Sequence, residues 1–148
     1  RARDAKIFED DCLEVFVDLD RDGFRFDGNP HDVQFGLAPS GPDGRRQLWA
    51  WGPLNRVPHE VEAAVRRQDD QILFEMGIPL ELLPGVGAQP VRFSVAYHDR
   101  DRDGTTGKLH WSIDTASRPG TILFGTMTLQ DGLTGSSAPR PGTATEFP

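Results

Sequence analysis

The chain has 148 residues, of which 36% are hydrophobic, which suits one domain with one core. Its 23 acidic residues outnumber the 16 basic ones, and the net charge of −7 disfavours nucleic acid and anionic membranes as partners. No apolar run approaches the ~18 residues of a membrane-spanning helix, and the first residues lack the apolar core of a signal peptide.

Short strand-like runs follow one another along the chain, separated by Gly, Pro and Asp. In the first run the odd positions carry Leu and Val on one face, and Glu14 lies on the other. The runs span residues 12–18, 32–38, 47–51, 61–65, 72–78, 91–98, 109–113 and 122–129, with one helical turn at 80–83. This pattern predicts an all-β fold, an antiparallel β-sandwich of the jelly-roll or immunoglobulin-like kind. We expect eight or more short strands and very little helix.

The domain boundaries follow from composition. Residues 1–130 are expected to form the sandwich, whereas residues 131–148 are rich in Gly, Ser, Thr, Ala and Pro and predict a flexible tail or linker. Residues 1–11 contain no complete strand, although a strong central-type strand begins directly after them. We therefore expect one or two N-terminal strands of the sandwich to be missing.

Two loops share the same sequence pattern, and each follows a strand-like run. They read Asp-x-Asp-Arg-Asp-Gly, at residues 18–23 and 99–104. Alternate Asp residues before a Gly can fold carboxylates around one hard cation. Neither loop is an EF-hand, because its twelfth position is Asn29 or His110 rather than Glu. The sequence predicts structural calcium at one loop at least, with the ligands Asp18, Asp20, Asp22, Asp99, Asp101 and Asp103. The alternative is a solvated turn whose charges are offset by neighbouring arginines.

The remaining candidates are few. Trp49 and Trp51 project from the same strand face, where indole rings can stack on a sugar ring or pack in the core. Cys12 is the only cysteine, so it forms no internal disulfide and is expected to be a packing residue.

The scattered histidines indicate no zinc site, although His98 is expected to order the second acidic loop. No catalytic motif is present, so we expect a non-catalytic protein.

Five segments in order, from about residue 8 to 129, carry a resemblance to a known family. Phe8–Asp18 resembles an aromatic residue, Asp-Asp and a Val-Glu-Ile-Phe-Leu-Asp strand of the family 9 carbohydrate-binding modules, in the DOMON-like sandwich superfamily. The other segments that resemble this family are Asp32–Phe35, Phe74–Pro79, Phe93–Asp103 with His110–Ser112, and Phe124–Leu129. The matched spacing makes the resemblance specific for this superfamily of antiparallel sandwiches.

The resemblance implies a module that binds sugars between two aromatic side chains, carries calcium and is tethered to a glycoside hydrolase. It also implies an extracellular, cell-surface or periplasmic location. Phe8 stands where the family has one clamp Trp, and Glu14 matches a carboxylate that binds sugar hydroxyls. Two features depart from the family: Gly36 replaces an Arg, and residues 114–120 lack the second clamp Trp.

Three functional hypotheses follow. The first is a calcium-stabilised carbohydrate-binding accessory module, with the ligand face Phe8, Glu14, Gln34, Trp49 and Trp51. The second is a structural or interaction module that has lost sugar binding, which Gly36 and residues 114–120 favour. The third is a haem-binding electron-transfer domain, because haem-binding relatives of this sandwich use Met as an axial ligand and Met76 replaces a small core residue.

Overall fold

A computed structural model describes most of residues 4–128. The described ranges are residues 4–24, 29–40, 45–54, 58–69, 71–84, 86, 89–101, 103–111 and 124–128. The predicted tail at residues 131–148 and the loop at residues 114–120 lie outside these ranges. Within them, no helix is long and apolar enough to cross a membrane.

The described part of the chain consists of strands and three short 3-10 helices, so the predicted all-β, antiparallel class is confirmed. The strands are β1 (Cys12–Asp18), β2 (Asp32–Ala38), β3 (Gln47–Trp51), β4 (Glu62–Gln68), β5 (Gln71–Gly77), β6 (Val91–Arg100), β7 (Thr106–His110) and β8 (Gly125–Met127). The 3-10 helices are η1 (Asp4–Glu9), η2 (Gly52–Leu54) and η3 (Leu80–Leu82). The first three strands have the predicted bounds.

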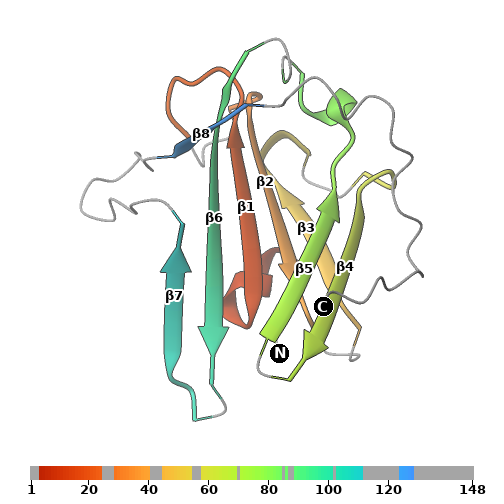
Figure 1. The fold of residues 1–148 in the computed structure, drawn as a ribbon, viewed down its shortest axis with the longest axis vertical. Coiled ribbons are helices and arrows are strands. Elements are labelled where there is room, and N and C mark those ends of the chain that lie inside the picture. The colour runs from red at the N-terminus through yellow and green to blue at the C-terminus, as the bar shows by residue number, and fades with distance from the viewer. Residues whose placement is uncertain are drawn as a thin grey trace, which may run out of the picture.

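The strands form two antiparallel sheets (Figure 1). The larger has the order β3-β2-β1-β6-β7, and β8 pairs with the beginning of β6. The smaller is the hairpin β4–β5. β1 is central: it pairs with β2 on one side and with β6, which follows much later in the sequence, on the other. Residues distant in sequence therefore meet across β1.

One face of the large sheet carries the main hydrophobic core. Val15 and Val17 of β1 pack there with Val33 and Phe35 of β2, as the odd-position pattern predicts. The β4–β5 hairpin lies against this face, because Met76 and the adjacent Val61 pack against the same cluster (Figure 1). The second layer thus consists of two strands over a sheet of six.

The opposite face of the large sheet is covered in part by η1. Ile7 of this 3-10 helix is fully buried against Cys12 and Ala38, and Trp49 and Trp51 pack against the same cluster. The absence of a predicted strand in residues 1–11 agrees with this short helix at Asp4–Glu9. The η1 segment brings Phe8 to the polar side chains of β1 and β2.

Candidate functional site

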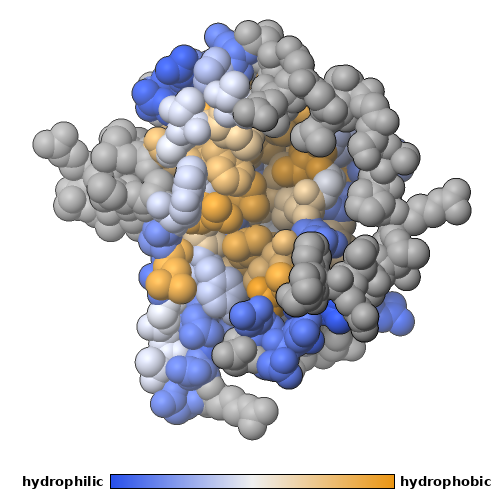
Figure 2. All heavy atoms as spheres, viewed as in Figure 1, coloured by the Kyte–Doolittle hydropathy of each residue, from blue (hydrophilic) through white to orange (hydrophobic). Residues whose placement is uncertain are grey.

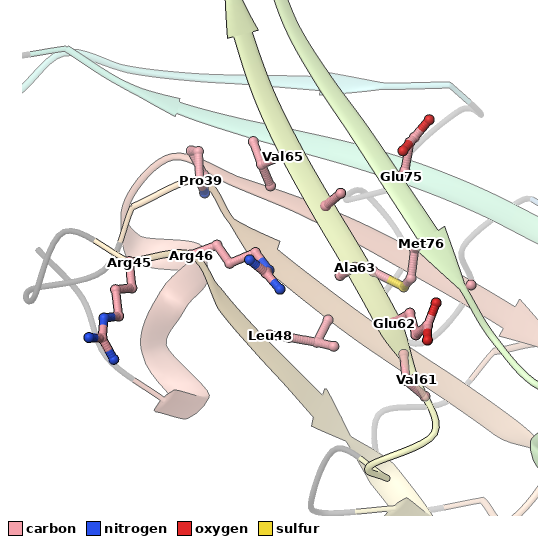
Figure 3. A pocket seen from close by; sticks show the side chains of 12 residues that line it. Pro39, Arg45, Arg46, Leu48, Val61, Glu62, Ala63, Val65, Glu75 and Met76 are labelled. Atoms are coloured by element: carbon pink, nitrogen blue, oxygen red, sulfur yellow. The ribbon is translucent and has the colours of Figure 1, made fainter. Parts of the chain in front are cut away.

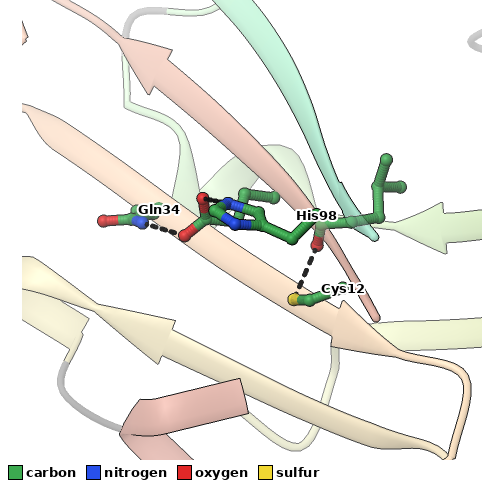
Figure 4. Close-up of polar contacts among 5 residues, drawn as sticks. Cys12, Gln34 and His98 are labelled. Atoms are coloured by element: carbon green, nitrogen blue, oxygen red, sulfur yellow. Dashed lines mark hydrogen bonds and ion pairs between the residues drawn. The ribbon is translucent and has the colours of Figure 1, made fainter. Parts of the chain in front are cut away.

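A buried carboxylate lies at the centre of the face that η1 covers. Glu14 of β1 is only 5% exposed. The Nε2 atom of Gln34 donates to Glu14 Oε1 at 2.8 Å, and Nε2 of His98 lies 2.5 Å from Glu14 Oε2 (Figure 4). Burying a charge is costly unless it is paired and hydrogen-bonded. Because β2 and β6 flank β1, each supplies one partner, and we call these three residues the polar cluster.

An aromatic pair borders the polar cluster. The ring of Phe8 lies 6.3 Å from that of Trp51 and 6.4 Å from that of His98, between centroids. Phe8 is 41% exposed, whereas Trp51 is half-buried. These spacings are typical of tilted aromatic contacts. The exposed ring of Phe8 therefore stands beside the hydrogen-bonding groups of the polar cluster.

The structure brings together most of the ligand face expected from the sequence. Phe8, Glu14, Gln34 and Trp51 meet at the polar cluster and its border. Trp49 packs in the neighbouring cluster with Ile7, on the same face.

His98 has a different role from the one expected. Its ring contacts Glu14 instead of ordering the second acidic loop, so that expectation is wrong. No local signal reveals this contact, because it depends on the antiparallel register that places Cys12 opposite His98.

The first acidic loop gathers its three carboxylates. Ligand atoms of Asp18, Asp20 and Asp22 all lie within 4.8 Å of one another. Asp18 is fully buried, and its carboxylate accepts hydrogen bonds from the N–H of Arg21 at 2.6 Å and of Gly23 at 3.1 Å. Both donors have positive φ, of 65° and 108°, which turns the loop back over the end of β1. The loop therefore holds a carboxylate cluster with one fixed member.

The electrostatics of this loop favour a cation. Burial raises the pKa of Asp18, although the hydrogen bonds from the N–H of Arg21 and Gly23 oppose the rise. Desolvation also acts to raise the pKa of Asp20. Hydrogen bonds with the N–H of Asp22 and with Asp18 outweigh it and lower that pKa. A divalent cation bound by the three carboxylates would offset both the cost of desolvating the Asp18 charge and the mutual repulsion of the carboxylates. Carboxylate oxygens in a flexible loop are the donors that calcium prefers.

The second acidic loop is arranged differently. Asp99, Asp101 and Asp103 are exposed, and in the part of the chain that the structure describes only the first loop forms a metal-compatible group of three. The Asp103 carboxylate accepts from the N–H of Thr105 at 2.9 Å, which closes the turn between β6 and β7. The residues of the first loop are therefore the ones that could hold a metal ion.

A separate groove of about 1280 Å³ lies on the opposite side of the large sheet, between β3 and the β4–β5 hairpin (Figure 3). Leu48, Val61, Ala63, Val65 and Met76 form its apolar lining, and Arg45 and Arg46 lie at its rim. Met76 also packs against the main core. None of the residues expected to bind sugar or calcium lines this groove.

Comparisons with protein families, with curated proteins and with solved structures find no match. The function is therefore inferred from the residues of the polar cluster, its aromatic border and the first acidic loop. These groups can bind hydroxyls, stack on an apolar ring face and hold a hard cation.

Proposed function

We propose that this domain is a non-catalytic carbohydrate-binding module that is stabilised by calcium. The observation that carries the proposal is the convergence of Phe8, Glu14, Gln34 and Trp51 on one face of the sheet. These residues come from η1, β1, β2 and β3, so the fold, and not the sequence order, assembles them. The resemblance to the family 9 carbohydrate-binding modules supports the same function.

The chemistry of the site suits a neutral sugar. The exposed ring of Phe8 offers a flat surface for the apolar face of a pyranose. Each of the two oxygens of Glu14 has one partner in the polar cluster, and a carboxylate has about four lone-pair sites, so it can accept further hydroxyl donors. Each such bond is typically worth about 1.5–3 kcal/mol. With one strongly exposed aromatic wall we expect a Kd in the micromolar to millimolar range, about −8 to −4 kcal/mol.

The calcium ion would have a structural role at Asp18, Asp20 and Asp22. The excess of acidic residues and the three gathered carboxylates support this assignment. A module that uses calcium in this way fits an extracellular, cell-surface or periplasmic location, tethered to a glycan-acting catalytic domain. These placements rest on the resemblance.

A second candidate function comes from the burial of the polar cluster. Glu14 and Gln34 are both largely buried, and they already satisfy each other. This favours a structural or interaction module in which the polar cluster fixes the register of β1, β2 and β6 and binds no sugar. The two candidates predict different consequences of removing the Phe8 ring.

Calorimetry against a broad panel of mono- and oligosaccharides tests the proposal. Phe8→Ala should abolish the binding heat of the wild-type domain, because the stacking surface is lost. Leu80→Ala is the matched control, since Leu80 is also an exposed apolar residue but lies in η3, on another element. We expect this control to bind like the wild type. An absence of heat with every sugar would reject sugar binding and leave the structural module.

A further inference from the structure

His98 is the most exposed member of the polar cluster. It is half-buried, whereas Glu14 and Gln34 are buried, and its side chain is 18% exposed against 6% for Glu14. Its Nε2 atom contacts Glu14, and no described residue forms a hydrogen bond with the other ring nitrogen, Nδ1. Nor does Nδ1 belong to the buried side-chain atoms without a partner in the described ranges. This nitrogen is therefore open to solvent and to a ligand.

The contact with Glu14 determines what Nδ1 can bind. A carboxylate only accepts hydrogen bonds, so the proton of this contact belongs to Nε2 of His98. In a neutral imidazole that carries its proton on one nitrogen, the other nitrogen is an acceptor. The buried carboxylate thus fixes the tautomer of the ring, and His98 presents an acceptor to solvent.

The exposed ring of Phe8 lies beside this acceptor. The two ring centroids are 6.4 Å apart, although Phe8 comes from η1 and His98 from β6. The hydroxyl groups of a pyranose project from the rim of its ring, so a sugar that stacks on Phe8 would bring hydroxyls to the level of the neighbouring side chains. The opposite face of the large sheet is different, because apolar atoms gather in the middle of the view in Figure 2.

We propose that His98 is a sugar-contacting residue whose Nδ1 accepts a hydrogen bond from a sugar hydroxyl while its Nε2–H holds Glu14. This inference rests on the proposed function and adds a residue that the ligand face expected from the sequence does not contain. An acceptor backed by a carboxylate selects a group that donates a proton and repels one that carries negative charge. The site should therefore take sugars with a free hydroxyl at this point and reject sugar acids.

Three variants of the full chain test this role by calorimetry at one neutral pH. The panel contains glucose, galactose, mannose, xylose and their linear oligomers, and the tightest binder serves as the probe. His98→Lys keeps a donor for Glu14 but has no acceptor, so it should weaken binding by about tenfold or more. His98→Gln keeps a donor and an acceptor and should stay within about threefold of the wild type.

His59→Lys is the matched control. His59 also lies next to a carboxylate, with its Nδ1 atom 3.2 Å from Glu60 Oε2, but its side chain is exposed and lies between η2 and β4. This variant should bind the probe like the wild type. Thermal melts would verify that all three variants are folded.

Nuclear magnetic resonance of the wild-type chain gives a readout that does not depend on substitution. With histidine labelled by nitrogen-15, long-range proton–nitrogen spectra report which ring nitrogen carries the proton. We expect the proton of His98 on Nε2, and a Nδ1 signal that shifts on addition of the probe and saturates with the calorimetric Kd. The signals of His59 should not move.

The outcomes separate this inference from the proposed function. A proton on Nδ1 of His98 in the free chain, a Nδ1 signal that the probe leaves unchanged, or a His98→Lys variant that binds like the wild type would overturn the role of His98. In each of these cases, binding heat from the wild type would still support a carbohydrate-binding module. An absence of heat with every sugar would overturn both proposals.

Discussion

The indole ring of Trp51 lies against the backbone of Gly36. A Cβ atom added to Gly36 would come within 2.5 Å of Trp51 Cη2 and 2.9 Å of Ile7 Cδ1. The ring thus occupies the space that a side chain on β2 would take, and η1 closes over it. Gly36 and the inward placement of Trp51 are therefore two parts of one packing arrangement.

Gly36→Ala is therefore expected to destabilise the fold. The added methyl group must displace Trp51 and Ile7, and overpacking of this kind typically costs about 1–3 kcal/mol. Urea denaturation would measure the loss in the free energy of unfolding. Gly77→Ala is the control, because its Cβ would lie 3.8 Å from Glu62 Cβ, an ordinary contact. An equal loss in both variants would contradict the packing explanation.

Glu14→Ala should lower the free energy of unfolding by about 1–3 kcal/mol, because it leaves the buried amide of Gln34 and the ring of His98 without their shared acceptor. A double-mutant cycle with His98→Ala would isolate the pair. Residues in direct contact show coupling energies of about 0.5–3 kcal/mol. Additive effects of the two substitutions would mean that the contact adds no stability.

Calcium should raise the melting temperature, and a chelator should lower it. If the first loop holds the ion, stabilisation is about 2.7 kcal/mol at a hundredfold excess over Kd. Asp18→Asn should remove this response, because Asp18 is the buried member of the carboxylate cluster. Asp103→Asn should keep it, since Asp103 lies in the loop that does not gather its carboxylates. A melting temperature that is the same with calcium and with chelator would contradict the metal assignment.

Cys12 should resist alkylation in the native protein. Burial, and then the nearby Glu14 carboxylate, raise the pKa of the thiol far above its ordinary value of 9.0. A raised folded-state pKa favours the protonated form, so its contribution to stability is fully present below about pH 9 and declines at higher pH. A thiol reagent at neutral pH should therefore react only after denaturant is added. Rapid labelling of the native chain would contradict this burial.

The strands were largely predictable, because each depends on local alternation and on turn residues. β1, β2 and β3 match their predicted bounds, and the turn expected at 80–83 is η3, at Leu80–Leu82. Boundaries were less accurate where apolar alternation continues into charged residues. The strand expected at 61–65 extends to Gln68 in the structure, because Arg66 and Arg67 pair across the hairpin with Leu73 and Ile72.

The site was predictable only in part. The resemblance indicated Phe8, Glu14 and Gln34, and these residues do lie together. His98 could not be found from the sequence, because its contact with Glu14 spans 84 positions and depends on the pairing of β1 with β6. The two acidic loops share one sequence pattern, and yet the burial of their first Asp differs in the structure. The fully buried Asp18 anchors the first, whereas the corresponding Asp99 at the end of β6 is exposed.

The central position of β1 also affects how the chain can be made. Its neighbour β2 follows closely, but its other neighbour, β6, includes His98, which is 84 positions beyond Glu14. At about 5–20 residues per second on the ribosome, β1 would wait several seconds with an open side. During that interval the nascent chain exposes a hydrophobic strand with one unpaired edge, which can form non-native pairs with other strands. Chaperones should therefore increase the yield of soluble protein most strongly when they act during translation.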